Sequence, residues 1–437
     1  MFAEEIRRKI EDFREIGIPG FVRRETVLHS VGNMVSSIIG GRRCGKSFMA
    51  WQAASDYIAS GFIKSPRQIC HVDFDNPIFS QMGPADLKLI QEVFLSVTPE
   101  LKLASPAVFI FDEIHNVTGW ERYLVEISRN NNWKVIATGS SSRLLRGEMS
   151  KELRGKAIST VIYPLSFSEF LRFRRFDAGS SGSTKNRAEI RRYFSEYLQW
   201  GAYPALCDIP DFSKPVLLRE YFDAMMLSDI IQRYNVSRPR QCVSLYRYLL
   251  SNMAKPYTQI SAFRFLKQAY SSTSRNAVFN YVGYAEDAWL LFSVPIFSTS
   301  IKEQERNYKK AYCIDWALAM HNSPVWDGSM SRGLENMIYI HLLRKGWRIN
   351  YHLTKSRRQE LDFIVRDSRG NPHMAVQVCM NLSSTETIER ELAPLRAASE
   401  YFGIKNNFIV TCDQEKMYSF GKIKIHAIPA WKWLIEF

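Results

Sequence analysis

Two short stretches of the sequence bring together the residue types that phosphate chemistry needs, and the first is a glycine-framed loop. Gly40, Gly45, Lys46 and Ser47 fit the pattern G-x-x-x-x-G-K-[ST]. The glycines let successive backbone N–H groups face a polyphosphate, the lysine can reach the β/γ-phosphates, and the hydroxyl can bind Mg²⁺. The sequence therefore predicts a nucleotide-binding loop. The residues expected to contact the nucleotide are Gly40, Gly41, Arg42, Arg43, Cys44, Gly45, Lys46, Ser47 and Phe48.

The second stretch supplies carboxylates. Residues 108–111 are apolar and lead into Asp112 and Glu113, as a buried parallel strand would when it delivers side chains to a sheet edge. Asp112 would belong to the Mg²⁺ shell, and Glu113 could orient and deprotonate an attacking water. Two acids after an apolar run can also mark a surface turn. Together with the loop, however, they predict a site that hydrolyses ATP with Mg²⁺, with Lys46 and Glu113 as catalytic groups.

Strands and helices must alternate to bring these two stretches to one place. Such alternation gives a parallel sheet with helices on both faces. We therefore predict an α/β fold with a P-loop NTPase sheet of the additional-strand type. In that type a polar residue at the end of the strand beside the acidic one senses the γ-phosphate, and Ser140 or Ser141 is placed for this task. The predicted strands are residues 34–39, 68–74, 108–111 and 134–138, and the predicted helices are residues 48–58, 86–97 and 120–129.

Composition limits the class of protein and of partner. The 437 residues include 58 Lys plus Arg against 44 Asp plus Glu, a formal net charge of +14. This excess favours a polyanionic partner, either nucleic acid or an anionic membrane face, although a generally basic surface is the alternative. The seven cysteines are scattered without metal spacing, which indicates reduced thiols in a cytoplasm. The first residues form a charged amphipathic segment without a signal-peptide core, and no apolar run approaches the length of a membrane span.

Six motifs stand out along the chain. They are GGRRCGKS at 40–47, FDEIH at 111–115, TGSSSRLLRG at 138–147, YPLSFSEFL at 163–171, WGAYP at 200–204 and LSDI at 227–230. With these motifs the chain resembles, over nearly its whole length, prokaryotic AAA-branch ATPases that have a winged-helix segment and a C-terminal restriction-endonuclease-like domain of the PD-(D/E)XK type. The combination of TGSSSRLLRG with YPLSFSEFL is the most specific part of the resemblance.

The resemblance implies ATP and Mg²⁺ as cofactors and a homo-oligomer, for which a hexameric ring is one candidate. In such assemblies a basic residue of one subunit reaches the γ-phosphate held by its neighbour. Arg143, Arg146 and Arg154 are the candidates, and we take Arg154 as the catalytic one. Related sequences usually have L-x-G-R here, whereas this chain has Lys156, so the identity of this arginine finger stays open. The resemblance also implies an adenine-side contact at Pro204.

Four segments follow from the sequence and the resemblance. They are an ATPase core at 1–175, a helical lid and connection at 176–238, a winged helix-turn-helix at 239–325 and a restriction-endonuclease-like domain at 326–437. Within the third segment we expect three helices, then wing strands, with residues 301–310 as a charged connection. The third helix carries Arg275 and Asn276, which can contact phosphates and base edges. Winged helices also dock on proteins, so a protein partner is the alternative to DNA.

In the last segment the resemblance predicts the remains of a nuclease site. Relatives place a helix Glu, a strand Asp and an E-x-K strand around Mg²⁺, and the corresponding positions are Glu335, Asp362 and Gln377. Gln377 and Cys379 replace the carboxylate and the lysine of the third element. Because the site loses an oxygen ligand and the cation beside the attacked phosphate, we expect a vestigial site without cleavage. Lys355, Arg357 and Arg358 form a basic stretch that could contact DNA instead.

Three hypotheses about function remain. The first is an oligomeric ATPase that binds or remodels DNA. The second is a nucleotide-dependent switch in signalling or defence, whose C-terminal domains bind protein partners. The third is an ATP-dependent nuclease, which the substitutions at Gln377 and Cys379 disfavour.

Overall fold

The computed structural model describes residues 1–140, 153–177, 184–324, 330–354 and 359–437. The chain divides into two units, Met1–Ile162 and Tyr163–Phe437. The predicted end of the ATPase core, at residue 175, lies inside the second unit. Within the described residues no helix has both the length and the apolar character needed to cross a bilayer.

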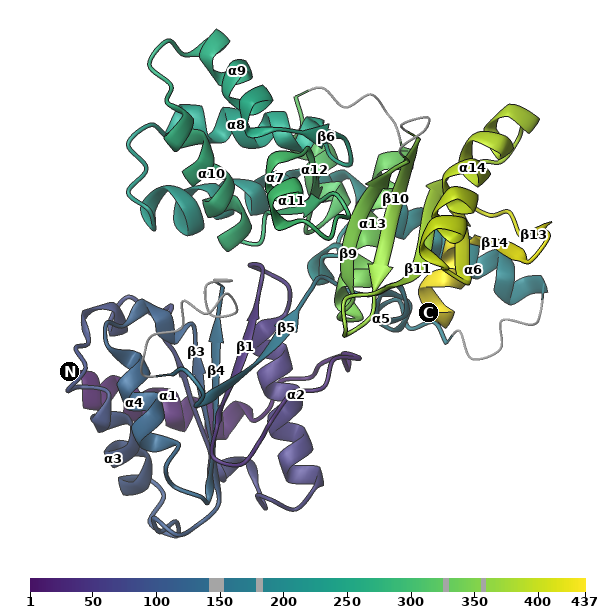
Figure 1. The fold of residues 1–437 in the computed structure, drawn as a ribbon. Coiled ribbons are helices and arrows are strands. Elements are labelled where there is room, and N and C mark those ends of the chain that lie inside the picture. The colour runs from purple at the N-terminus through teal and green to yellow at the C-terminus, as the bar shows by residue number, and fades with distance from the viewer. Residues whose placement is uncertain (141–152, 178–183, 325–329, 355–358) are drawn as a thin grey trace. The chain divides into compact units, whose positions relative to one another are not determined.

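The first unit is built on five strands. They are β1 (Val35–Gly40), β2 (Ile69–Asp73), β3 (Ala107–Asp112), β4 (Trp133–Gly139) and β5 (Ala157–Ile162). The strands form one sheet in the order β2-β3-β4-β1-β5 (Figure 1), and every neighbouring pair is parallel. Strand β4 thus lies between β1, which precedes the glycine-framed loop, and β3, which ends at the acidic pair. This order confirms the predicted P-loop NTPase sheet of the additional-strand type.

Helices cover both faces of this sheet. They are α1 (Phe2–Ile16), α2 (Lys46–Ala59), α3 (Lys88–Ser96) and α4 (Trp120–Ile127), with short 3₁₀ turns at Pro66–Gln68, Phe79–Gln81 and Ile114–Asn116. Helices α3 and α4 lie on one face and α2 on the other (Figure 1). Phe109 contacts Phe94 of α3, and Phe111 contacts Tyr123 of α4. All six residues of β3 are buried, as expected for a central parallel strand.

The second unit begins with helices. They are α5 (Phe167–Phe173), α6 (Thr184–Trp200), η5 (Pro204–Cys207), η6 (Asp211–Ser213), α7 (Lys214–Ala224), a π-helical segment η7 (Met225–Gln232), α8 (Pro239–Ser251), α9 (Gln259–Ala269) and α10 (Arg275–Asp287). The last three correspond to the three helices predicted for the third segment.

A small antiparallel sheet follows. It has the order β6-β8-β7, with β6 (Pro256–Tyr257) inserted between α8 and α9, and with β7 (Leu291–Pro295) and β8 (Lys309–Cys313) forming the main pair. The charged connection predicted at 301–310 links β7 to β8 and contains the short helix α11 (Ile301–Arg306), but its predicted end was wrong, because Lys309 and Lys310 are the first two residues of β8. The start of β8 is highly charged, and such a sequence is typical of a solvated segment. In the structure Lys310 of this strand is buried and forms ion pairs.

The C-terminal part contains a mixed six-stranded sheet in the order β13-β14-β12-β11-β10-β9. Pairs β11·β12 and β12·β14 are parallel, and the outer pairs are antiparallel. Its elements, with the helices that precede and cover it, are α12 (Trp316–Asn322), α13 (Met330–Arg344), β9 (Arg348–Leu353), β10 (Glu360–Arg366), β11 (Pro372–Cys379), α14 (Thr385–Phe402), β12 (Asn406–Thr411), β13 (Lys416–Phe420), β14 (Ile423–Pro429) and α15 (Ala430–Glu436).

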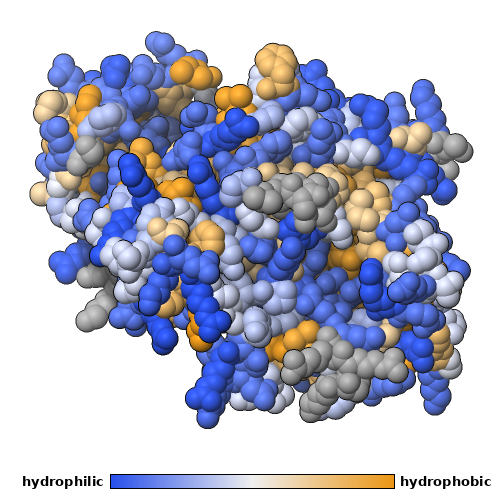
Figure 2. Space-filling view, turned by 90° about the horizontal axis from the view of Figure 1, so that it is seen from above, coloured by the Kyte–Doolittle hydropathy of each residue, from blue (hydrophilic) through white to orange (hydrophobic). Residues whose placement is uncertain are grey.

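The surface is mainly polar, as expected for a chain with 23% charged residues. On the face shown in Figure 2 most side chains are hydrophilic, and the hydrophobic ones gather in small, separate patches.

Candidate functional site

The glycine-framed loop turns sharply from strand β1 into helix α2. Gly45 has φ +93°, and Arg43 has φ +66°, so two residues of the loop adopt the left-handed conformation that curls a backbone into an anion-binding cradle. A Cβ at Gly40 would lie 2.1 Å from the carbonyl oxygen of Ile162 on β5. Gly40 therefore lets β1 end tightly against its neighbouring strand, while Gly45 allows the turn into α2.

Lys46 and Glu113 meet at this end of the sheet. The Lys46 Nζ lies 3.2 Å from Glu113 Oε1 and donates a hydrogen bond of 3.3 Å to the carbonyl oxygen of Gly41. Lys46 is only 6% exposed. Burial by itself would raise the pKa of Glu113, but the Lys46 ammonium, with a smaller contribution from His115, outweighs it and holds the pKa below its usual value. Glu113 is therefore ionised and able to accept a proton near neutral pH.

Asp112 lies beside Ser47 and Thr138. It accepts side-chain hydrogen bonds from both hydroxyls. Burial raises its pKa, and these two hydrogen bonds act in the opposite direction. A carboxylate next to a hydroxyl at the start of a helix matches the donor set that Mg²⁺ uses when the phosphates supply its other ligands. The predicted placement of Ser47 and Asp112 side by side is therefore what the structure has.

Thr138 was not singled out by the sequence analysis. Its hydroxyl donates to Asp112 Oδ1 and accepts a hydrogen bond of 2.9 Å from the backbone N–H of Glu113. One side chain on β4 thus fixes both members of the acidic pair on β3. The sequence did place Thr138 at the end of the predicted strand 134–138. Its role could not be predicted, because it depends on the pairing of β4 with β3, which only the fold shows.

The residues next to Thr138 were the predicted γ-phosphate sensors. The Ser140 Oγ is buried and has no hydrogen-bond partner within the described part of the chain, which suits a group that waits for a ligand. Ser141 lies outside the described residues, and so do the finger candidates Arg143 and Arg146. Arg154 is described and exposed.

Arg24 is a further residue that the sequence analysis did not assign. Its Nη1 donates a hydrogen bond of 2.8 Å to the carbonyl oxygen of Cys44, inside the loop. The Gln52 amide of α2 accepts from the Arg24 N–H at 2.7 Å and donates to the Arg24 carbonyl at 3.3 Å. The segment before β1 is therefore fixed to α2, and its guanidinium supports the loop.

Two of the motifs, YPLSFSEFL and WGAYP, form hydrogen bonds that stabilise the second unit. Ser166 and Glu169, of YPLSFSEFL, form a reciprocal capping box at the start of α5, and the Glu169 carboxylate lies 3.5 Å from Arg344 of α13. In WGAYP, the Ala202 N–H donates a hydrogen bond of 2.6 Å to the buried Asp315. Pro204 begins the η5 turn in the same unit, and its adenine contact stays a prediction.

The predicted DNA-contacting residues divide into two groups. Arg275 and Asn276 open helix α10 and are exposed. Their helix is capped by Ser274, whose hydroxyl accepts from the Ala277 N–H. Lys355, Arg357 and Arg358 lie outside the described residues.

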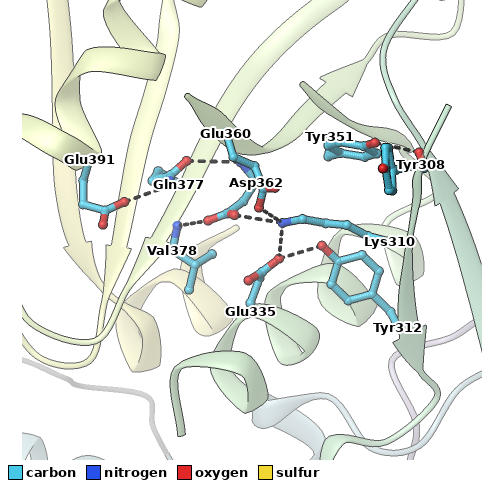
Figure 3. A network of polar contacts seen from close by, with 10 residues as sticks. All are labelled: Tyr308, Lys310, Tyr312, Glu335, Tyr351, Glu360, Asp362, Gln377, Val378 and Glu391. Carbon is cyan, nitrogen blue, oxygen red and sulfur yellow. Dashed lines mark hydrogen bonds and ion pairs between the residues drawn. The ribbon is translucent and has the colours of Figure 1, made fainter. Parts of the chain in front are cut away.

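Glu335 and Asp362 do converge, and a buried lysine occupies the space between them (Figure 3). The Lys310 Nζ lies 2.8 Å from Glu335, 2.6 Å from Glu360 and 3.1 Å from Asp362, and the lysine is fully buried. Tyr312 donates a further hydrogen bond of 2.7 Å to Glu335. Sequence analysis missed Lys310, because it lies far from both acids in the chain and reaches them from β8.

Gln377 completes this acidic centre without a charge of its own. It accepts a hydrogen bond from the Asp362 N–H and donates one to Glu391 on α14, at 3.1 and 2.8 Å (Figure 3). Within the described residues no group of three or more His, Cys, Asp or Glu side chains is arranged to hold a metal ion. Burial, and after it the neighbouring Asp362 carboxylate, raise the pKa of Glu335 to about 8, although the Lys310 ammonium acts in the opposite direction.

Comparisons with known proteins agree with the geometry of the first unit. Residues 32–171 match the family described as AAA domain, and residues 191–326 match a domain of unknown function (DUF8612). An uncharacterized protein of Methanocaldococcus jannaschii is 28% identical over 100% of this chain and 96% of its own length. An uncharacterized protein of Haemophilus influenzae is 26% identical over 80% of this chain and 83% of its own length.

Among solved structures, the Walker-type ATPase of Pyrococcus abyssi aligns with a TM-score of 0.37 and 14% identity, over 74% of this chain and 96% of that one. The Orc1 protein of Aeropyrum pernix, solved with DNA, aligns with a TM-score of 0.29 and 12% identity, over 72% of this chain and 90% of that one. Residues 32–171 thus match the AAA-domain family, and the described part of the first unit has a five-stranded parallel P-loop NTPase sheet at whose edge the glycine-framed loop meets the acidic pair.

Proposed function

We propose that this protein binds ATP with Mg²⁺, hydrolyses it, and couples the cycle to binding or remodelling DNA in an oligomer. The observation that carries the first part is the convergence of Lys46, Ser47 and the Asp112–Glu113 pair at one end of the sheet. These groups come from the start of α2 and the end of β3, and Thr138 of β4 joins them.

The residues present fit the nucleotide and its metal. Ser47 and Asp112 would hold Mg²⁺, which would offset the negative charge of the phosphates. Lys46 would meet the β/γ-phosphates in place of its contact with Glu113. The freed Glu113 carboxylate would orient a water and take its proton as the water oxygen bonds to the γ-phosphorus and the bond from that phosphorus to the β–γ bridging oxygen breaks, so that ADP leaves. The buried Ser140 hydroxyl, which has no partner within the described part of the chain, would meet the γ-phosphate.

Support for DNA contact comes from the order of elements in the second unit. Helix α8, strand β6, helices α9 and α10, and the β7·β8 pair follow the order of a winged helix-turn-helix. Arg275 and Lys267 both lie within 6 Å of the Phe263 ring, at 5.7 and 5.8 Å from its centroid, so two cations gather at the start of α10. The net charge of +14 favours a polyanion.

One experiment tests the proposal as a whole. The ATPase rate is measured with and without single-stranded, duplex and branched DNA, for the native chain and for Arg275→Ala with Asn276→Ala. We expect DNA to raise the rate of the native chain and the double variant to lose this stimulation. We also expect the logarithm of the DNA-binding constant to fall linearly with the logarithm of salt concentration. Unchanged rates with every DNA would refute coupling to DNA.

The oligomer has its own test. The particle mass is measured with a non-hydrolysable nucleotide, and Arg154→Ala is mixed with Lys46→Ala. If Arg154 is the arginine finger, the mixture recovers activity that each variant lacks alone, because each supplies the half-site the other has lost. A monomer under all nucleotide conditions would exclude the shared site.

A second candidate function is a nucleotide-dependent switch that docks on a protein. It is favoured by Phe279, a large apolar side chain that is 62% exposed on α10, the helix that also carries Arg275, because docking on a protein would remove this ring from water. Binding of a partner that does not weaken with salt, together with a DNA-insensitive ATPase rate, would favour this function over the first.

A further inference from the structure

We propose that a cavity in the C-terminal part of the chain binds a nucleobase that carries a phosphate. The cavity has a volume of about 230 Å³ and lies where the end of α13, the starts of β11 and β12, and helix α15 meet. It belongs to the second unit, and it does not involve the glycine-framed loop of the first unit. The inference is therefore independent of the proposed ATPase.

Aromatic rings supply the walls. Trp347 stacks on His373, with ring centroids 5.3 Å apart and an angle of 13° between the planes. Phe408 lies 4.9 Å from Trp433, which in turn stacks on Phe437 at 4.3 Å. Rings of this kind favour a flat aromatic occupant. Because the volume is below the roughly 300 Å³ at which pockets for drug-sized ligands begin, the occupant is a single flat ring system.

The charge of the residues around the cavity indicates which kind of flat ring it binds. Lys345 lines the cavity, and no Asp or Glu side chain is among the lining residues. The neighbouring Arg348 and Lys405 are exposed, next in sequence to the lining residues Trp347 and Asn406. Aromatic cages for ammonium ligands depend on attraction of a cation, which this rim of positive charge opposes. A planar ring with an attached phosphate has the complementary charge, and a nucleotide unit meets both requirements.

Two buried nitrogens lie in the wall of the cavity. His341 Nε2 and Trp433 Nε1 belong to side chains that line it, and neither has a hydrogen-bond partner within the described residues. His341 is 5% exposed and Trp433 is fully buried. Because both nitrogens are covered by protein, the groups that an occupant meets are the partly exposed rings and Lys345.

The experiment uses the full chain with Lys46→Ala, so that the glycine-framed loop does not contribute nucleotide binding, and it omits Mg²⁺. Binding is measured for AMP and dTMP, and separately for a fluorescent single-stranded oligothymidylate. Strand containing photoreactive thymine analogues is also crosslinked to the protein, and the crosslinked peptides are identified by mass spectrometry.

The variants are Trp347→Leu, which removes a stacking ring, and Lys345→Glu, which reverses an exposed charge. Phe212→Ala is the matched control, because this aromatic residue is 82% exposed and lies outside the cavity. We expect Trp347→Leu to weaken binding roughly fivefold to a hundredfold, the usual range for loss of one stacked base. Lys345→Glu should weaken it in a salt-dependent way, and Phe212→Ala should leave it unchanged. Thermal melting of each variant reports whether it folds.

Binding of the mononucleotides and the strand would identify free nucleotides as a source, and binding of the strand alone would identify nucleic acid. Both outcomes support the proposal if crosslinks map to Trp347 or Phe408. It is overturned if neither probe binds at millimolar concentration, or if folded Trp347→Leu and Lys345→Glu proteins bind as tightly as the parent. ATP hydrolysis is measured separately, with the chain in which Lys46 is intact. A negative result for the cavity therefore does not refute the proposed ATPase, and loss of the ATPase proposal does not refute binding in the cavity.

Discussion

Lys46 Nζ lies 3.2 Å from Glu113 Oε1, so the cation suited to a γ-phosphate is paired with the carboxylate suited to activating water. The pair is mostly buried, with the lysine and glutamate side chains 5% and 17% exposed. A phosphate that attracts Lys46 would break this pair and release the glutamate at the same moment. Binding and activation of the site are thereby linked through one side chain.

Glu113→Gln tests the role of the carboxylate. The amide can still occupy the space but cannot take a proton, so we expect ATP to remain bound while turnover falls about a hundredfold or more, the usual range for loss of a general base. Single-turnover hydrolysis with radiolabelled ATP measures this. Glu100→Gln, an exposed acid of the same unit, is the control, and near-native turnover of Glu113→Gln would mean that another group activates the water.

Thr138→Val tests the hydroxyl that holds the acidic pair. Valine keeps the shape and removes both hydrogen bonds, to Asp112 and from the Glu113 N–H. We expect kcat to fall about tenfold, because the carboxylates lose their fixed positions, while ATP affinity changes little. Thr138→Ser retains the hydroxyl and should recover most of the rate. If serine and valine variants behave alike, the hydroxyl has no part in positioning.

Arg24→Ala tests the support beneath the loop. Removing the hydrogen bond to the Cys44 carbonyl should weaken ATP binding by about tenfold to a hundredfold, since one hydrogen bond from a charged group contributes roughly 1.5–3 kcal/mol. Equilibrium titration with a fluorescent ATP analogue provides the measurement. Arg23→Ala is the matched control, because its partner Asp56 is half exposed and the pair lies on the surface. Equal affinities for both variants would remove Arg24 from the nucleotide site.

Lys310→Met tests the acidic centre. The change leaves Glu335, Glu360 and Asp362 without their shared cation, so we expect a loss of about 3–5 kcal/mol in the free energy of unfolding. Lys309→Met, at the adjacent and more exposed position that pairs with Glu305, should cost far less. Denaturant unfolding compares the two. A native-like midpoint for Lys310→Met would show that the carboxylates do not need this cation.

Much of the first unit could be predicted from the sequence, because its signals are local. Strand β3 is a run of apolar residues that ends at Asp112, and the loop between β1 and α2 has its glycines and lysine at fixed spacing. The parallel order of strands then brings the loop and the acidic pair together without further information. What remained hidden were Thr138, which acts from β4 on the acidic pair of β3, and Arg24, which supports the loop from the segment before β1, because their partners are far away in the chain.

The second unit was harder because its interactions are mainly long-range. Lys310 sits in a stretch of charged residues that is typical of a solvated connection, yet three carboxylates from α13 and β10 bury it. The strand that carries it pairs with β6 and β7, and no local pattern reveals such a pairing. The convergence of Glu335 with Asp362 was implied by resemblance, and its cation could be found only from the fold.

Titration of the native chain and of Lys46→Ala with ATP, in the presence and absence of Mg²⁺, tests the central claim most directly. The account predicts tight, Mg²⁺-dependent binding followed by release of phosphate for the native chain, and loss of both for the variant, with its fold intact by circular dichroism. Equal ATP affinity and equal phosphate release by the two proteins would contradict it, because then Lys46, Ser47 and the Asp112–Glu113 pair would not be where the nucleotide is bound and cleaved.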